Sequence, residues 1–170
     1  MIVLILRHAA QDWQEMAQMD RIDRKIVRAL QRDGRISNRE LAEQVGLSPS
    51  PCLRRLKALE ASGVIRGYHA DVDPELYGLP LTVFIRVRLE RHDEETVAGF
   101  EAKVRANDTI VECHVMTGQA DYLLRVMVAD LPDYERFVRR ELQRIGGIAS
   151  IDTSFAYGQV KERAAFPGVT

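Results

Sequence analysis

The chain has 170 residues, of which 46% are hydrophobic and 29% charged, a composition ordinary for one or two small globular domains. Two cysteines are too few for a disulfide framework, and the four histidines show no zinc-binding spacing, so we expect no metal and no cofactor. The net charge of −1 hides an asymmetry, because residues 20–66 hold 11 Lys and Arg against 6 Asp and Glu, whereas residues 67–170 hold 12 against 17. The first half alone therefore suits a polyanionic partner.

Residues 1–19 form an N-terminal extension. The apolar run from Ile2 to Leu6 is too short to span a membrane, and no basic segment precedes it as in a signal peptide. We expect either a loosely attached extension or a backward lengthening of the first helix in which Trp13 packs. We therefore expect a cytoplasmic protein without a membrane partner, in line with its few cysteines.

Three short helical patterns follow, in residues 20–63. The first has apolar residues at helical spacing behind Asp20, a suitable N-cap. The second begins at Ser37, which forms the pair of a capping box with Glu40. Two helices joined by a short glycine-containing turn are typical of a helix-turn-helix. We therefore predict a three-helix, winged helix-turn-helix domain over residues 20–70.

The third helical pattern, capped by Ser48, has the residue distribution of a helix that reads the major groove. Its apolar side carries Cys52, and its opposite side carries Arg54 among small residues that allow close approach to a duplex. The alternative is an ordinary amphipathic helix with solvated basic residues. We predict that Arg54 contacts a base and that the rest of the DNA-binding surface consists of Arg39, Ser48, Ser50, Pro51, Arg55 and Lys57.

Residues 64–70 read as a short strand, a vestigial wing, and residues 71–78 read as a linker with Pro74 and Gly78 as breakers. A second domain is predicted over residues 79–163, followed by a tail, residues 164–170. Its patterns run strand, helix, strand, strand, helix, strand, over residues 79–90, 93–106, 109–117, 121–129, 131–145 and 148–157. This order predicts a ferredoxin-like α+β domain, an antiparallel sheet with both helices on one face.

The uncovered face of that sheet needs a partner, because it is expected to be half apolar. We assign to it Phe84, His114, Met116 and Phe155. The simplest partner is the same face of a second copy, which gives a two-fold homodimer. A dimer would also present two reading helices to a palindromic DNA site.

The turn between the two middle strands is the best candidate for a small-molecule site. Gly118 frees backbone N–H groups that suit a carboxylate, and Asp121 could pair with an ammonium group, so the turn could hold an amino acid. The alternative is a plain hairpin, in which Gly and Asp serve the turn geometry alone.

Several runs resemble the Lrp/AsnC family of leucine-responsive, or feast/famine, transcriptional regulators, over roughly residues 20–163. The runs are DRIDRKI at 20–26, GRIS at 34–37, VGLSPSPC at 45–52, GVI at 63–65, ECH at 112–114 and GQADYLL at 118–124. The resemblance implies binding to double-stranded DNA, dimerisation through the second domain with further assembly to octamers, and an amino-acid effector. The effector residues that it implies are Thr117, Gly118, Gln119, Ala120, Asp121, Tyr122, Leu131, Ser154, Phe155 and Ala156. Gln119 and Ala120 are not fixed in the family, so the resemblance does not name the amino acid.

Two other functions fit the same layout. Some haem-pathway decarboxylases resemble it, but a tetrapyrrole's carboxylates call for a basic pocket, and the second half of this chain is acidic. An RNA-binding module would stack bases on exposed aromatic residues of the sheet, which the pattern lacks. We therefore expect a regulator and not an enzyme.

Overall fold

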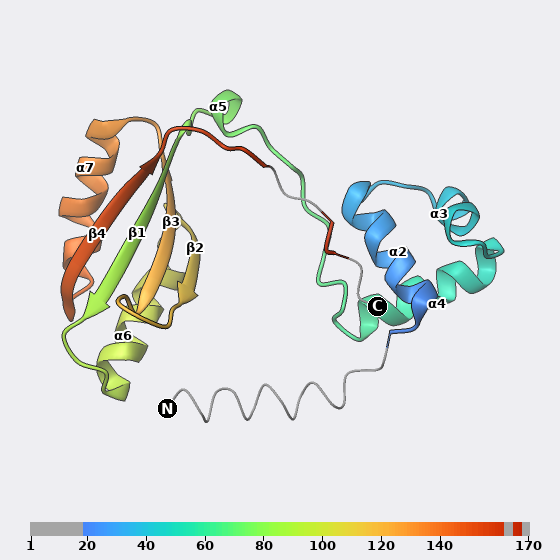
Figure 1. Ribbon diagram of the computed structural model, residues 1–170, viewed down its shortest axis with the longest axis horizontal. Coiled ribbons are helices and arrows are strands. Elements are labelled where there is room, and N and C mark those ends of the chain that lie inside the picture. Colours follow the sequence, from blue (N-terminus) through green and yellow to red (C-terminus); the bar gives the residue numbers. More distant parts are fainter. Residues whose placement is uncertain (1–18, 162–164, 168–170) are drawn as a thin grey trace. The chain divides into compact units, whose positions relative to one another are not determined.

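The structure is a computed structural model that describes residues 19–161 and 165–167 (Figure 1). The predictions for residues 1–18 lie outside the described residues. The chain divides into two compact units, one built on the helices before Ala70 and the other spanning Asp71–Lys161. No helix in the described ranges has the length and apolar character needed to cross a bilayer.

The first unit consists of three helices, α2 (Arg21–Arg32), α3 (Asn38–Val45) and α4 (Pro49–Ala61). Two of the three predicted N-caps, Asp20 and Ser37, form capping boxes. The Asp20 side chain accepts from the backbone N–H of Asp23, and Ser37 does the same for Glu40. The carboxylates of Asp23 and Glu40 accept in turn from the backbone N–H groups of Asp20 and Ser37, so these N–H groups are satisfied locally. The helices enclose one apolar core, made of Ile26, Leu41, Ala42, Val45, Cys52 and Leu59.

The predicted start of α4 is confirmed in position, whereas the predicted strand over residues 64–70 is wrong. Ser48 occupies the N-cap position of α4, but its side chain makes no capping hydrogen bond. Residues 64–70 contain no strand. A strand needs a neighbour for its ladder, whereas this segment returns to α4: the Ile65 N–H donates to the Leu59 carbonyl (3.1 Å), and the Tyr68 hydroxyl donates to Glu60 (2.8 Å).

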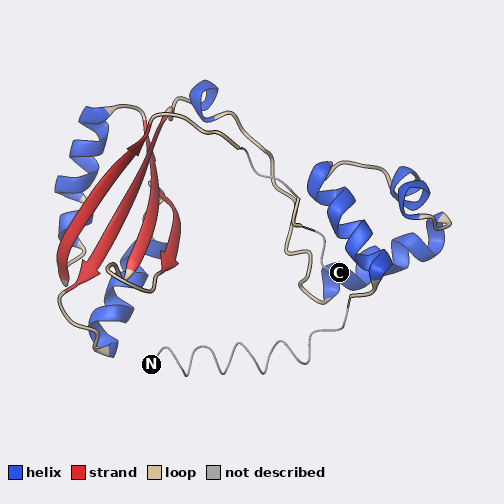
Figure 2. Ribbon diagram, viewed as in Figure 1, coloured by secondary structure: helices blue, strands red, loops and turns tan. Residues whose placement is uncertain are grey.

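The second unit is a four-stranded antiparallel sheet with its helices on one face (Figure 2). The strands have the spatial order β2-β3-β1-β4, which confirms the ferredoxin-like prediction. Its elements are α5 (Pro74–Tyr77), β1 (Leu81–Leu89), α6 (Glu94–Arg105), β2 (Ile110–Val115), β3 (Tyr122–Val128), α7 (Leu131–Arg140), the 3-10 turn η1 (Leu142–Arg144) and β4 (Ile148–Ala156).

Two boundaries differ from the sequence prediction. The linker contains α5, a single turn that the Asp73 side chain caps. The helix predicted to reach residue 145 ends at Arg140, and its C-cap Glu141 (φ −116°) accepts from the Asn107 side-chain amide (2.6 Å). The following 3-10 turn still buries Leu142 against the sheet, so the apolar pattern extends past the end of the helix.

The side chains of β1 alternate as predicted. Val83, Ile85 and Val87 are completely buried under α6 and α7, where they pack against Phe100 and Phe137. Burial of such side chains stabilises each by about 1.5–3 kcal/mol relative to exposure. Phe84 points to the opposite, uncovered face, as expected from the two-residue period of a strand.

The assignment of Phe155 to the uncovered face is wrong. Phe155 is the register partner of Val83, so it lies on the helix-covered face. There its ring packs edge-on against Tyr134 of α7, with 5.1 Å between ring centroids. The cause is an irregularity in the β1–β4 ladder, between Arg88 and Leu89, which shifts the alternation of β4.

An ion-pair cluster joins α4 to the start of α2. One Arg55 guanidinium nitrogen lies 2.7 Å from an Asp20 carboxylate oxygen and 2.8 Å from an Asp23 oxygen. The pKa of Asp20 is held below its usual range, first by the Asp23 N–H and then, against partial burial, by Arg55. The two aspartates in turn raise the pKa of Arg55. The cluster therefore links a helix cap to the neighbouring helix.

We expect Arg55→Met to lower the urea concentration at the midpoint of unfolding at pH 7, because two carboxylates lose their cation. The folded pKa of Asp20 is depressed, so this stability is present above its unfolded pKa, near 3.9, and is lost as the pH falls through the folded value. The difference from wild type should therefore shrink at pH 3. Urea unfolding followed by circular dichroism measures it, with the exposed Arg54→Met as the matched control. An equal cost for both variants would contradict a specific role for the cluster.

Candidate functional site

The exposed face of α4 carries three of the seven predicted DNA-binding residues. Ser50, Arg54 and Lys57 are exposed, whereas Cys52 and Leu59 on the opposite side are buried. Burial raises the pKa of the Cys52 thiol, as expected for a core cysteine. Arg54 therefore projects into solvent from the side of α4 opposite the core.

The relative position of α3 and α4 is set by a contact that sequence reasoning missed. The Asn38 side-chain amide donates to the Pro49 carbonyl (2.9 Å), joining the first turns of the two helices. Gly46, at φ +77°, ends α3 and allows the tight turn between them. The local signal for Asn38 is only a polar residue after an N-cap, because its partner is eleven residues away.

The remaining predicted DNA-binding residues differ in their surroundings. Arg39 lies on the exposed side of α3, where its guanidinium is 3.5 Å from Glu43, an exposed pair that contributes little. Ser48 is exposed and Pro51 is half-buried at the start of α4. Arg55 is engaged with the two aspartates at the start of α2, which gives it an orienting role within the domain.

The predicted effector turn follows β2 and leads into β3. Gly118 has φ +108°, a conformation that favours glycine, and no atom lies within 4 Å of a Cβ placed there. Thr117, Gln119 and their neighbours are exposed, and Tyr122 is buried with its hydroxyl donating to Glu101 (3.2 Å). The turn is therefore accessible, while its last residue is anchored in the sheet.

Asp121 is held by two groups of the same chain. One carboxylate oxygen accepts from the Leu89 N–H (2.8 Å), and the other is 2.8 Å from His92 Nε2. Burial raises the pKa of Asp121, but the Leu89 and His92 hydrogen bonds outweigh it, so the pKa lies below the usual range. The carboxylate is ionised and already paired, so an ammonium ligand would share it with His92.

Sequence reasoning missed the roles of Leu89 and His92. They lie 32 and 29 residues before Asp121, and only the pairing of β1 with β3 brings them to the turn. No local pattern near residue 90 marks this contact.

The other predicted effector residues lie at the opposite end of the sheet. Tyr122 pairs with Val87, whereas Ala156 pairs with Thr82, five residues earlier along β1. At roughly 3.4 Å per residue, Ala156 is about 17 Å from Tyr122 along the strand direction, and Ser154, which pairs with Phe84, is about 10 Å from it. The group at this end consists of Leu131, Ser154, Phe155 and Ala156. A single chain therefore does not bring the predicted effector residues together.

No three His, Cys, Asp or Glu side chains gather as a metal site within the described residues. Cys113 lies beside Glu101, and its pKa is raised first by burial and then by that carboxylate, so its thiol is a weak nucleophile. His114 follows it in β2 and takes the next position along β3 in the register, so the two side chains point to opposite faces.

Comparison with known proteins gives one consistent result. A winged helix-turn-helix DNA-binding model matches residues 19–66, and the Lrp/AsnC ligand-binding domain matches residues 82–166. The Bkd operon transcriptional regulator of Pseudomonas aeruginosa is 45% identical over 152 residues, covering 89% of this chain and 99% of the relative. The leucine-responsive regulatory protein of Escherichia coli is 40% identical, covering 85% of this chain and 88% of the relative.

Solved structures agree with these relatives. The transcriptional regulator NMB0573 of Neisseria meningitidis, in complex with L-Met, superposes with a TM-score of 0.83 at 39% identity, covering 88% of this chain and 97% of that one. Escherichia coli AsnC gives a TM-score of 0.78 at 26% identity, covering 87% of this chain and 98% of that one. The chain therefore belongs to the Lrp/AsnC family of DNA-binding transcriptional regulators.

Proposed function

We propose that this regulator reads its operator with the exposed face of α4 and that its second unit responds to an amino acid. The observation that carries the first part is the exposed Arg54, on a helix whose other side is buried in the helix-turn-helix core. The second part is supported by the match to the family's ligand-binding domain and by the similar protein solved with L-Met.

The proposed base contact is Arg54, because its guanidinium can donate two hydrogen bonds to a guanine edge. Backbone contacts are assigned to Ser50, Lys57 and Arg39, with Ser48 and Pro51 at the edge of the same surface. Arg55 leaves this group, since its two close carboxylates compete with any phosphate. Its contribution to DNA binding is then to hold α4 in position.

We expect Arg54→Ala to weaken binding to the operator by about 1–3 kcal/mol and to relax the choice of base at one position. Lys57→Gln is the matched comparison: it should weaken all sequences alike and reduce the slope of affinity against salt by about one. Fluorescence anisotropy with operator and scrambled duplexes at several salt concentrations measures both effects. If Arg54→Ala weakened both duplexes equally, Arg54 would be a phosphate contact.

Dimerisation through the uncovered face of the sheet is part of the proposal. This face carries half-buried Phe84, Leu123 and Met127 among ion pairs such as Arg86 with Asp152 (3.1 Å). A two-fold axis running across the strands would bring the turn of one copy to the Ser154 end of its partner. This arrangement would bring the turn toward Ser154 and Ala156, which lie on the partner's uncovered face, whereas Phe155 lies on the covered face. Further assembly to an octamer follows the family resemblance.

The amino acid would place its carboxylate at the N–H groups of the Gly118 turn and its ammonium at Asp121. His92 occupies the same carboxylate, so the ligand and His92 compete. Leu131 and Phe155 are exposed apolar residues suited to the ligand's side chain.

We expect His92→Ala to tighten amino-acid binding a few-fold, because it frees one Asp121 oxygen while the Leu89 N–H still holds the other. Asp121→Asn should abolish the response. Analytical ultracentrifugation measures the change in assembly size with each common amino acid, and thermal melting measures the change in stability. If Asp121→Asn responds as wild type does, the turn is an ordinary hairpin.

A role as a tetrapyrrole decarboxylase finds no support, because the similar proteins are named as transcriptional regulators. We also propose that the protein has no enzymatic activity and acts in the cytoplasm.

A further inference from the structure

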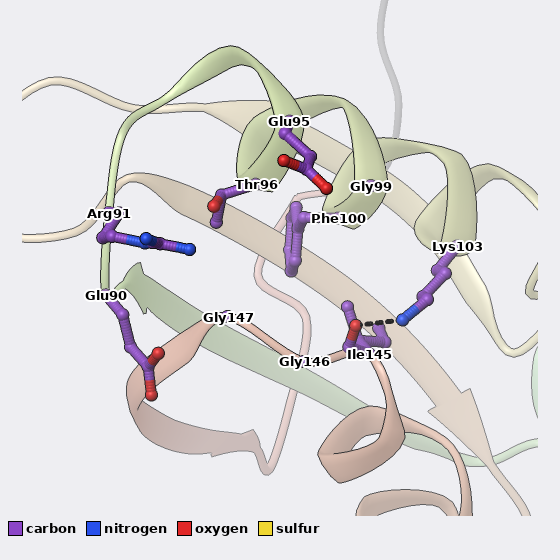
Figure 3. Close-up of a pocket in the computed structure, with 10 residues that line it drawn as sticks. All are labelled: Glu90, Arg91, Glu95, Thr96, Gly99, Phe100, Lys103, Ile145, Gly146 and Gly147. Atoms are coloured by element: carbon purple, nitrogen blue, oxygen red, sulfur yellow. Dashed lines mark hydrogen bonds between the residues drawn. The ribbon is translucent and has the colours of Figure 1, made fainter.

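A cavity of about 300 Å³ lies between α6 and the glycine turn that precedes β4 (Figure 3). It is at the end of the sheet where β1 finishes, and the buried ring of Phe100 forms part of its wall. Its volume is at the lower limit for small-molecule pockets, which measure roughly 300–1,000 Å³. None of the effector residues predicted from the sequence lines it.

Both signs of charge line this cavity. Arg91 and Glu95 direct their side chains into it in Figure 3, and Glu90 and Lys103 complete the charged lining. The Lys103 ammonium donates to the carbonyls of Arg144 and Ile145, which uses two of its three N–H groups. Lys103 is therefore fixed in place with one donor to spare.

The glycine turn adds backbone donors. Gly146 and Gly147 have φ +76° and +70° and follow a residue in right-handed helical geometry, a sequence of conformations that aims successive N–H groups at one point. Within the described residues neither N–H has an acceptor. A Cβ on Gly147 would lie 2.9 Å from the Thr96 side chain, so the close approach of this turn to α6 requires glycine.

We propose that this cavity binds a small zwitterion, an α-amino acid, as a second ligand site of the chain. The carboxylate would accept from Lys103, Arg91 and the glycine N–H groups, and the ammonium would pair with Glu95 or Glu90. The Phe100 side of the cavity gives an apolar side chain a contact. This inference rests on the proposed amino-acid response, and it assigns the ligand to a different set of residues.

The segment from Leu89 to His92 connects this cavity with the Gly118 turn. The Leu89 N–H and the His92 ring hold Asp121, while the Glu90 N–H donates to the Gly147 carbonyl (2.8 Å). Glu90 and Arg91 line the cavity itself. A ligand that moves Arg91 therefore acts on a four-residue segment whose two ends position the turn, which couples the two places.

Gly99 offers a direct test. It lines the cavity from α6, and no atom lies within 4 Å of a Cβ placed on it, so Gly99→Leu fills the space without straining the helix. Gly99→Ala is its control. Arg91→Ala removes the exposed cation, and Arg139→Ala, another exposed arginine paired to an acidic neighbour, is its control.

Isothermal titration calorimetry of the full-length protein with each common L-amino acid measures affinity and stoichiometry. We expect Gly99→Leu and Arg91→Ala to weaken one binding event by about tenfold or more, with both controls unchanged. Binding that is unchanged in Gly99→Leu and Arg91→Ala overturns the cavity, as does a wild-type protein that binds no amino acid. Asp121→Asn separates the two proposals. If Asp121→Asn loses amino-acid binding while Gly99→Leu binds normally, the Gly118 turn is the only site. If Gly99→Leu loses binding while Asp121→Asn binds normally, the cavity is the only site.

Discussion

The second unit depends on the position of β1 between two antiparallel neighbours. Its backbone pairs with β3 on one side and β4 on the other, and its alternate side chains are fully buried under the helices. A central strand of this kind cannot shift by one residue without moving Val83, Ile85 and Val87 to the uncovered face. Its two ends therefore define two fixed places, and every candidate ligand residue of the unit lies at one or the other.

Some of the basic charge in the first unit is neutralised by ion pairs within that unit. Residues 20–66 carry an excess of basic groups, yet Arg55 is neutralised by Asp20 and Asp23 inside the domain. Of the basic residues proposed to contact DNA on α4, Arg54 and Lys57 are exposed. Charge counts alone overstate the field toward a phosphate backbone, because paired groups contribute little beyond the first few ångströms.

Much of the fold follows from patterns within a few residues. The caps at Asp20 and Ser37 were predictable because their partners lie three residues away. The alternation of β1 was predictable because it follows the two-residue period of a strand. The strand predicted over residues 64–70 is absent from the structure. A strand depends on a neighbouring strand, and the local sequence pattern does not reveal whether one is present. The face of Phe155 depends on an irregularity in the ladder, which no period in the sequence records.

The candidate sites show the same limit more strongly. Arg54 was found from helical periodicity, whereas the engagement of Arg55 spans 35 residues and that of Asp121 spans 29 to 32. A sequence motif suggests a role for a residue, but it does not show which groups of the same chain already bind that side chain.

The hydrogen bond between Asp121 and His92 affects how a ligand would act at the turn. An ammonium group that reaches Asp121 must replace part of its bond to His92, so binding at the turn and release of the segment after β1 are one event. The same segment is bonded to the Gly147 carbonyl and lines the α6 cavity. Because the two groups of predicted effector residues lie at opposite ends of one sheet, a change at the turn reaches Ser154 only through the stiff ladder of β1 or through a second copy. A packed antiparallel ladder transmits little deformation along its strands, which favours the contact between copies as the place where ligand and assembly are linked.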